Sequence, residues 1–309
     1  MRRSAPNLSI AALAATLAAL AATLAAPSAG RASTVSACRA AAPPSVLLQN
    51  QGQLESVLVD RRGRLLFTDR VRQALLVVPH RGAPPRVLAD GIADPGGIVE
   101  DRHGRLLVGF GNNAQNSLAA PAVGGAGLYA VDPVSGRKTV FLRGLSMANG
   151  VVRAPNGTLY ASSVASASLD RVPPGGQAER AWATPRSSNG LALRGRYLFA
   201  NVSLPPTEII RIDTRDPARI VPWAAPPAAD ANAVLDGLAR GRRGRLLAAA
   251  FVAGEVWRAD GPGRLCTLAR GLPNPSSVAL GRGHRGFQRR AAYVATYGGS
   301  VVELPRADA

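Results

Sequence analysis

A repeated template runs through the chain from residue 50 onwards and constrains the fold more than any other feature. Each copy has a polar or small residue, then Gly or Ser, two apolar residues, a polar turn and an apolar run. The fifth copy, for example, comprises residues 236–239 and 244–247. The six copies begin at Glu55, Gly96, Asn149, Asn189, Asp236 and Ser276, so successive copies are spaced by 41, 53, 40, 47 and 40 residues.

A period near forty residues, with about four short strands in each unit, is typical of a β-propeller blade. Apolar runs bounded by Gly, Pro and Asp supply the later strands of a unit, as in residues 75–78 and 86–88. The six copies fill residues 45–305, so we predict an all-β, six-bladed propeller with about four antiparallel strands in each blade. We expect residues 300–304 to close the ring against residues 46–48, because closure removes exposed sheet edges.

The first part of the chain has the pattern of an export signal. Met-Arg-Arg precedes an apolar run over residues 8–26, and small residues continue to Ala32. This pattern predicts a secretory signal peptide over residues 1–32, cleaved after Ala32 or after Ala37, and a flexible tail over residues 33–44. An uncleaved membrane anchor is the alternative. No second segment is long enough to span a bilayer, and we expect the protein to be periplasmic or secreted.

The chain has only two cysteines, Cys38 and Cys266. In an oxidising compartment these two could form a disulfide. Two unpaired thiols are an alternative. Residues 35–38 also resemble a lipobox, so Cys38 could instead carry a lipid anchor while Cys266 is buried.

The formal net charge of +18 does not by itself indicate a nucleic-acid partner. Lys138 is the only lysine, so 36 of the 37 basic residues are arginine, and they are scattered through turns. A basic block with interleaved aromatic residues, which nucleic-acid binding would require, is absent. We therefore expect no nucleic-acid partner, and we leave adhesion to polyanions or membrane surfaces as an alternative.

The first residue of each copy is a candidate for chemistry, because every blade of a propeller contributes its leading residue to the mouth of one central channel. Five of these residues carry a side chain with oxygen, and none is Cys or His. They are Glu55, Asn149, Asn189, Asp236 and Ser276. Oxygen donors of this kind suit Ca²⁺, and suit Mg²⁺ or Mn²⁺ less well. Zn²⁺ is disfavoured, because it prefers His and Cys.

The alternative is that these residues are turn residues with no ion between them, since Asn-Gly and Asp-Gly are common in turns. The recurrence of such dipeptides at one phase of the repeat favours the metal site. Three other aspartates, Asp60, Asp132 and Asp213, lie in turn contexts and are interpreted as hairpin residues.

With these residues in place, the chain resembles the superfamily of senescence-marker protein, gluconolactonases and luciferin-regenerating enzyme, with paraoxonases and drug-responsive lactonases as distant relatives. The resemblance covers residues 50–305 and rests on Glu55, on the Asn-Gly pairs at Asn149 and Asn189, and on the copy that begins at Asp236. It implies one divalent ion, usually Ca²⁺, held by these four residues. It also implies hydrolysis of lactones or related esters.

Two departures from that superfamily concern the substrate. The place where sugar-lactone members carry an arginine is occupied by Met147, and the place of the paraoxonase histidine is occupied by Gly96. Neither the sugar clamp nor the histidine base therefore carries over. We expect a more apolar substrate pocket that includes Gly96, Met147 and Ser276.

The sequence thus predicts a metal-dependent hydrolase in which the ion polarises a carbonyl and Asp236 positions or deprotonates water. The expected partner is a small lactone or ester, and the expected state is a monomer. Two alternatives are a non-catalytic ligand-binding propeller of the cell envelope and a metal-free relative similar to strictosidine synthase. Residues 111–127, an insertion between strands, are either a lid over the channel or a connector.

Overall fold

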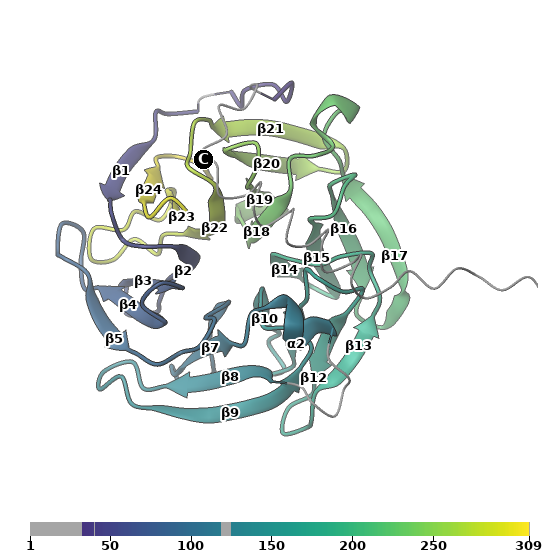
Figure 1. The fold of residues 1–309 in the computed structure, drawn as a ribbon. Coiled ribbons are helices and arrows are strands. Elements are labelled where there is room, and N and C mark those ends of the chain that lie inside the picture. The colour runs from purple at the N-terminus through teal and green to yellow at the C-terminus, as the bar shows by residue number, and fades with distance from the viewer. Residues whose placement is uncertain (1–32, 40, 119–124, 309) are drawn as a thin grey trace, which may run out of the picture.

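The computed structural model describes residues 33–39, 41–118 and 125–308. The chain forms six four-stranded antiparallel sheets arranged as blades around a central channel (Figure 1). The predicted six-bladed propeller is therefore confirmed. The signal peptide predicted for residues 1–32 lies outside the described residues. Within them, no helix has the length and apolar character needed to cross a membrane.

Each of the first five blades is built from four strands that are consecutive in the chain. Blade one contains β2 (Leu54–Val59), β3 (Leu65–Asp69), β4 (Ala74–Val78) and β5 (Arg86–Ala89). Blade two contains β6 (Ile98–Glu100), β7 (Leu106–Phe110), β8 (Ala126–Val131) and β9 (Lys138–Leu145). Blade three contains β10 (Val151–Arg153), β11 (Leu159–Ser162), β12 (Leu169–Val172) and β13 (Glu179–Ala183). Blade four contains β14 (Leu191–Arg194), β15 (Tyr197–Val202), β16 (Glu208–Asp213) and β17 (Asp216–Ala224). Blade five contains β18 (Leu235–Arg240), β19 (Leu246–Ala250), β20 (Glu255–Gly261) and β21 (Arg264–Ala269). The short helices are α2 (Ala114–Leu118) and the 3-10 turns Ala228–Asp230 and Arg242–Gly244.

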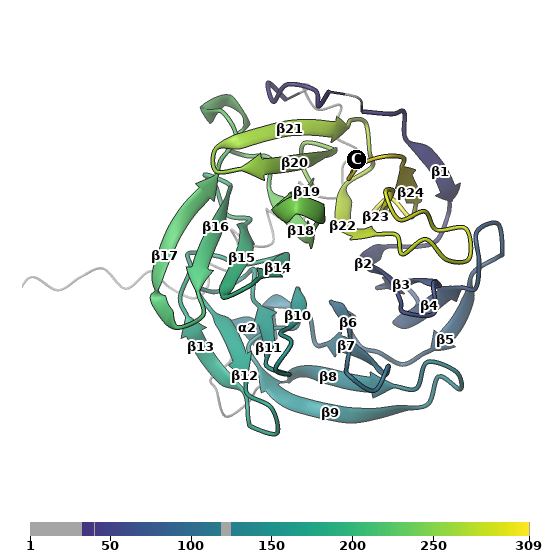
Figure 2. The ribbon, with the colours of Figure 1, turned by 180° about the vertical axis from the view of Figure 1, so that it is seen from behind.

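Blade six is made from both ends of the described chain. It contains β22 (Pro275–Leu280), β23 (Ala292–Thr296) and β24 (Val301–Leu304), with β1 (Ser45–Leu48) as its outer strand. β1 runs antiparallel to β24, with Ser45 opposite Glu303. Figure 2 shows β1 beside β24 at the rim of the ring. The predicted closure is confirmed, and it leaves no break between the first and last blades.

The hydrophobic core is divided among the interfaces between neighbouring blades. Six clusters of buried residues occur, and each combines side chains from two adjacent blades. Phe67 of blade one and Tyr293 of blade six, for instance, belong to one cluster. Because every blade buries both of its faces, the strands are short apolar runs, and the core positions the inner strands around the channel.

In four of the six copies a glycine follows the leading residue, and this glycine allows neighbouring inner strands to approach closely. A Cβ on Gly190 would lie 2.1 Å from the backbone nitrogen of Leu238 in the next blade. The Gly190 N–H donates a 2.9 Å hydrogen bond to the carbonyl of Asp236. Only glycine leaves room for this contact. The Asn-Gly dipeptide is thus required at a blade interface here, and not by a tight turn.

The segment expected to be a flexible tail, residues 33–44, is anchored over residues 33–39. Ala37 pairs in parallel with Thr267 of β21. The Cys38 N–H donates to the Thr267 carbonyl at 2.9 Å, and the Thr267 N–H donates to the Ser36 carbonyl at 2.8 Å. Cys38 and Cys266 form a disulfide, so the Cys38 sulfur is not free to carry a lipid. The segment therefore covers the outer edge of blade five.

Replacing both Cys38 and Cys266 by Ser should lower the melting temperature by about 5–10 °C, because the disulfide joins residues 228 positions apart and restricts the unfolded chain. Thermal unfolding followed by circular dichroism measures this shift. The unmutated protein in excess reductant is the matched control and should show a loss of similar size. An unchanged melting temperature in both would contradict a stabilising role for the bond.

Candidate active site

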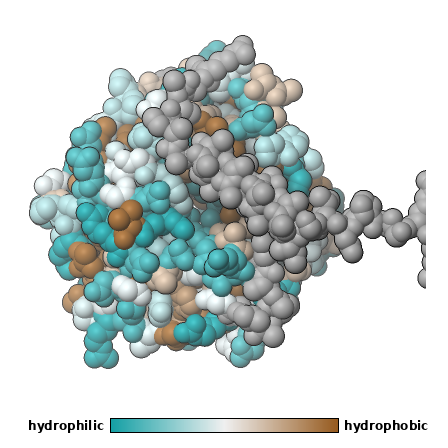
Figure 3. Space-filling model, in the orientation of Figure 1, coloured by the Kyte–Doolittle hydropathy of each residue, from teal (hydrophilic) through white to brown (hydrophobic). Residues whose placement is uncertain are grey.

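The leading residues converge at one end of the central channel. A cavity of about 590 Å³ is lined by the inner strands, with Glu55, Asn149, Asn189, Asp236 and Ser276 at their starting ends. The inner strands all begin at the same face, so residues separated by nearly two hundred positions share one small space. In the part of that face not covered by grey atoms, hydrophilic residues predominate and hydrophobic ones are isolated (Figure 3).

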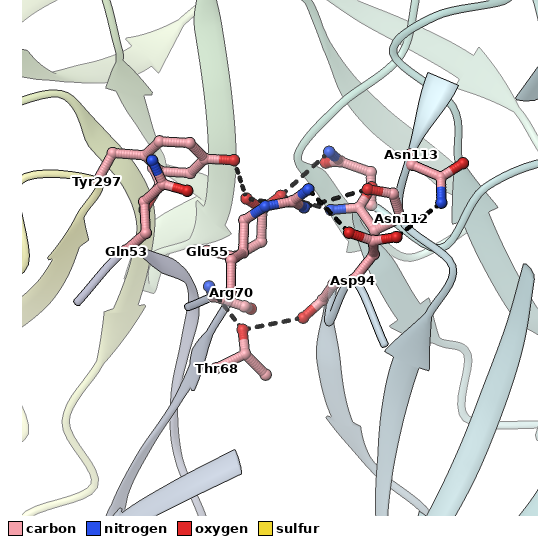
Figure 4. A network of polar contacts seen from close by, with 12 residues as sticks. Gln53, Glu55, Thr68, Arg70, Asp94, Asn112, Asn113 and Tyr297 are labelled. Carbon is pink, nitrogen blue, oxygen red and sulfur yellow. Dashed lines mark hydrogen bonds and ion pairs between the residues drawn. The ribbon is translucent and has the colours of Figure 1, made fainter. Parts of the chain in front are cut away.

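Glu55 is the most densely contacted of these residues (Figure 4). Its Oε1 accepts hydrogen bonds from Asn112 Nδ2 at 2.7 Å and from Asn149 Nδ2 at 3.3 Å. Its Oε2 accepts a 2.6 Å hydrogen bond from the Tyr297 hydroxyl, and Arg70 Nη1 lies 3.9 Å from the same oxygen. The carboxylate is buried and therefore fixed in place by four neighbouring side chains.

Asp236 lies close enough to Glu55 for their charges to interact. Burial raises the pKa of the Asp236 carboxyl well above its usual range, and the charge of Glu55 raises it further. A hydrogen bond from Asn189 and the positive charge of Arg70 oppose this rise in pKa. The Asp236 side chain is partly exposed, because it borders the channel. Two carboxylates thus occupy one poorly solvated site with too little positive charge around them.

Arg70 supplies the nearest positive charge at the mouth. It donates a 3.1 Å hydrogen bond to the Asn112 carbonyl and forms an ion pair with Asp94, with 3.3 Å between Nη2 and Oδ1. Asp94 is in turn held by Asn113 Nδ2 at 2.8 Å. Burial disfavours the charge of Arg70, yet the surrounding carboxylates, Glu55 first, raise its pKa. The guanidinium is therefore charged and held beside Glu55.

Tyr297 is held on the other side of Glu55. Burial raises the pKa of its hydroxyl well above the usual value, and the charge of Glu55 adds to the rise. The hydroxyl consequently stays protonated and acts as a hydrogen-bond donor to Glu55 at neutral pH. Its ring packs edge-on against Phe251, with 5.1 Å between the ring centroids.

Arg70, Asn112 and Tyr297 are not among the residues predicted from the repeat, although a positional signal exists for them. Each follows the second strand of its blade by one or two residues: β3, β7 and β23 end at Asp69, Phe110 and Thr296. The second strand runs antiparallel to the inner strand, so its end returns to the face where the inner strand begins. Residues directly after each second strand therefore belong to the same mouth.

The three residues predicted to line a substrate pocket occupy different settings. Ser276 borders the channel, and its hydroxyl donates to the Leu54 carbonyl of the adjoining blade at 2.7 Å. Met147 is buried, with Ser163 Oγ 3.8 Å from its sulfur. A Cβ on Gly96 would lie 1.9 Å from the Ala148 carbonyl oxygen, so Gly96 is packed against the next blade.

The three aspartates interpreted as hairpin residues do serve that role. Asp60 accepts a 2.8 Å hydrogen bond from the Arg64 N–H, and Asp213 accepts one of 3.1 Å from the Arg215 N–H. Asp132 accepts hydrogen bonds from the N–H groups two and three residues later, at 3.0 and 2.7 Å. None of these contacts involves the channel mouth.

The insertion within blade two, between β7 and β8, contributes α2 to the side of the mouth. Ser117 of α2 donates to Ser166 at 2.8 Å and contacts Ser163, which follows the second strand of blade three. The helix is thus tied to blade three. Residues 119–124 lie outside the described residues, and the choice between lid and connector stays a prediction.

The donor set fits a hard divalent cation. Glu55 and Asp236 would supply two carboxylates, and Asn149 and Asn189 would supply carboxamide oxygens, which are the ligands that Ca²⁺ prefers. The Asn112 Oδ1 atom beside Glu55 is buried and has no hydrogen-bond partner. Among the described residues, no three His, Cys, Asp or Glu side chains group as a metal site, so the two carboxamides are needed to complete one.

Solved structures with the same fold include proteins of the predicted resemblance. A gluconolactonase from Xanthomonas campestris is 18% identical with a TM-score of 0.70, over 91% of this chain and 96% of that chain. A luciferin-regenerating enzyme is 16% identical with a TM-score of 0.66, over 85% of this chain and 95% of the other. Regucalcin from Agrobacterium tumefaciens, described as a calcium-binding protein, is 15% identical with a TM-score of 0.63, over 85% of this chain and 93% of the other.

At these identities the comparisons show a shared fold. The resemblance expected from the sequence is thereby confirmed as a resemblance of structure. No model of a protein family matches the chain, and no curated protein matches it. Because one fold hosts many functions, the chemistry must be argued from the site.

Proposed function

We propose that the protein is a hydrolase of lactones or related esters, with Asp236 as its catalytic carboxylate. The observation that carries the proposal is the meeting of Glu55, Asn149, Asn189 and Asp236 at one mouth of the channel. These four residues would hold one divalent cation, which we propose to be Ca²⁺. When bound, the cation would supply a Lewis acid for the substrate carbonyl and neutralise the two carboxylates. The gluconolactonase of the same fold supports this reaction class.

Asp236 is suited to accept a proton from the attacking water. Its carboxyl borders the channel cavity beside Glu55, where a bound substrate and a water molecule would meet. Asn189, which hydrogen-bonds the Asp236 carboxyl, would hold its orientation. The general base and the water would thus meet at the floor of the mouth, where the inner strands of blades four and five start.

Tyr297 and Arg70 would act on the outer side of the same site. The Tyr297 hydroxyl donates to Glu55 Oε2 and so fixes that carboxylate. The Arg70 guanidinium, which is 21% exposed, faces the region where hydrolysis would create a product carboxylate. With Met147 in the place of a sugar-binding arginine, we propose substrates with an apolar acyl or alkyl portion in preference to sugar lactones.

A metal-free reaction is the second candidate, and Arg70 is the observation that favours it. A guanidinium 3.9 Å from Glu55 Oε2 already offsets part of the negative charge without any ion. In this case Glu55 would pair with Arg70, and Asp236 would work alone. We also propose export of the protein, since the leader pattern and the disulfide both fit an oxidising compartment.

Metal removal should separate the two candidates. Under the main proposal, purified protein contains about one equivalent of calcium, and EDTA lowers turnover of aliphatic lactones and aryl esters by at least about 100-fold. Added Ca²⁺ restores the rate, whereas EDTA already saturated with Ca²⁺ has no effect and serves as the control. Elemental analysis and a lactone and ester panel supply the measurements.

Each other outcome has its own meaning. Full turnover in metal-free protein would favour the second candidate. One equivalent of calcium with no turnover across the panel would favour a ligand-binding propeller with a structural ion. Turnover of sugar lactones alone would contradict the proposed apolar substrate class.

A further inference from the structure

Residues 33–38 fold against blade five as an integral part of the domain. Ser33 is only 9% exposed, and Val35 is 3% exposed within the apolar cluster that contains Trp257. The Val35 carbonyl accepts hydrogen bonds from Thr267 Oγ1 at 3.1 Å and from Arg270 Nη2 at 2.5 Å. A segment held by burial, hydrogen bonds and a disulfide is not spacer chain.

The backbone nitrogen of Ser33 lies against a buried acid. It is 3.3 Å from Glu255 Oε1, and Ser33 Oγ donates to Glu255 Oε2 at 2.7 Å. Glu255 is 1% exposed, and its other contacts come from Trp257 Nε1 at 2.6 Å, Thr267 Oγ1 at 3.1 Å and Arg270 Nη1 at 2.6 Å. The Ser33 nitrogen and the Arg270 guanidinium therefore both contact Oε1 of the Glu255 carboxylate.

The charges that contact this part of the segment do not balance. Asp230 Oδ2 accepts hydrogen bonds from Thr34 N at 2.8 Å and from Thr34 Oγ1 at 2.6 Å. Among the described residues that contact Ser33 and Thr34, Asp230 and Glu255 are acidic and Arg270 is basic. Asp230 is half-exposed, whereas Glu255 is buried with two acceptor oxygens directed at the Ser33 nitrogen and hydroxyl, so one further positive charge at this nitrogen would balance the group and pair with the buried carboxylate.

We propose that the peptide bond between Ala32 and Ser33 is the processing site, and that the α-ammonium of Ser33 is the counter-ion of Glu255 in the mature protein. A leader peptidase would hydrolyse the bond with water, which leaves a carboxylate on Ala32 and the ammonium on Ser33. Gly30 and Ala32 provide the small residues such cleavage requires. The other candidate, after Ala37, would remove Ser33 and Val35 from their buried positions. This inference is independent of the proposed hydrolase function.

The position of the cut is tested by producing the full chain in an exporting bacterium and measuring the intact mass and terminal sequence of the mature protein. The expected mature chain begins at Ser33. A chain that begins at Cys38 or at any other residue, or one that retains the leader, would overturn the proposal.

The pairing of the ammonium with Glu255 can be tested by measuring how fast the N-terminal amine is acylated, because this chain has few other amines. Lys138 is the only lysine, so the exported Lys138→Arg variant has a single amine, at its N-terminus. An amine-reactive acylating reagent at neutral pH should modify that amine at least tenfold more slowly in the folded protein than in the same protein unfolded in urea. The Glu255→Gln change in this background should bring the folded rate to within about threefold of the unfolded rate.

Equal rates in the folded and unfolded Lys138→Arg protein would refute the ion pair, whatever Glu255→Gln does. If Glu255→Gln does not yield folded protein, Asp230→Asn takes its place and should give a smaller increase in rate. A slow rate that neither substitution in a folded variant alters would show burial without the proposed pairing, and would also count against it.

Discussion

Replacing Asp236 by Asn should lower lactone turnover by about 10³-fold while the propeller stays folded. Asn keeps the size and one oxygen of the side chain but cannot accept a proton from water, and general-base groups contribute about 10²–10⁴ to such rates. Initial rates on the best lactone of the panel, with saturating Ca²⁺, measure the loss. Asp132→Asn, an exposed hairpin change, is the matched control and should leave the rate unchanged.

The melting temperature of Asp236→Asn provides a second test, because the substitution removes a charge from the site. The pKa of Asp236 is raised in the folded state, so without calcium the wild-type protein loses stability as the pH rises through that pKa. Asn stays neutral, and Asp236→Asn should therefore melt at a higher temperature than wild type at pH 8 in EDTA. An active Asp236→Asn protein would remove the catalytic assignment, whereas a less stable one at pH 8 would contradict the repulsion with Glu55.

Replacing Gly190 by Ala should destabilise the protein by about 3 kcal/mol, which corresponds to a fall of about 6–12 °C in melting temperature. The added Cβ would lie 2.1 Å from Leu238 N and 2.4 Å from the carbonyl carbon of Gly237. Both atoms belong to backbone, so no side chain can move to relieve the overlap. Urea unfolding measures the loss, and turnover should fall too because the Gly190 N–H binds the Asp236 carbonyl.

The matched control for this change is Gly176→Ala. Gly176 is exposed, its φ is not in the left-handed region, and the nearest atoms to an added Cβ are side-chain carbons of Pro173 at 3.3 Å and beyond. Its effect should be within about 0.5 kcal/mol. Equal stabilities of the two variants would mean that the blades separate easily, and the account of the repeated glycine would be wrong.

The repeat could be predicted because one requirement recurs in every blade. Each inner strand needs an apolar run, and four of the six also have a glycine where they meet their neighbour, so the spacing of these copies predicted the ring and the positions that face its mouth. That Glu55 and Asp236 lie at the same mouth follows from their shared position, as the leading residues of two copies of the repeat. The position in the repeat does not predict which side chains contact one another at the mouth. Those contacts depend on side-chain length and on the bends after the second strands.

Arg70 and Tyr297 illustrate the residues that were missed. Both lie directly after a second strand, where neither Arg nor Tyr recurs in another blade, so no repeated residue marks them. The anchoring of residues 33–39 was missed for a different reason. Its polar contacts lie with Asp230, Glu255 and Arg270, about two hundred positions away, and a short stretch of small residues gives no local sign of them.

The pairing of β1 with β24 has a consequence for biosynthesis. Among the described residues, β1 is the first strand to be synthesised, and it has no partner until β24, the last, is complete. A growing chain therefore carries an unpaired strand edge for most of its synthesis. Nascent or prematurely terminated chains that stop before residue 301 would expose that edge to other chains.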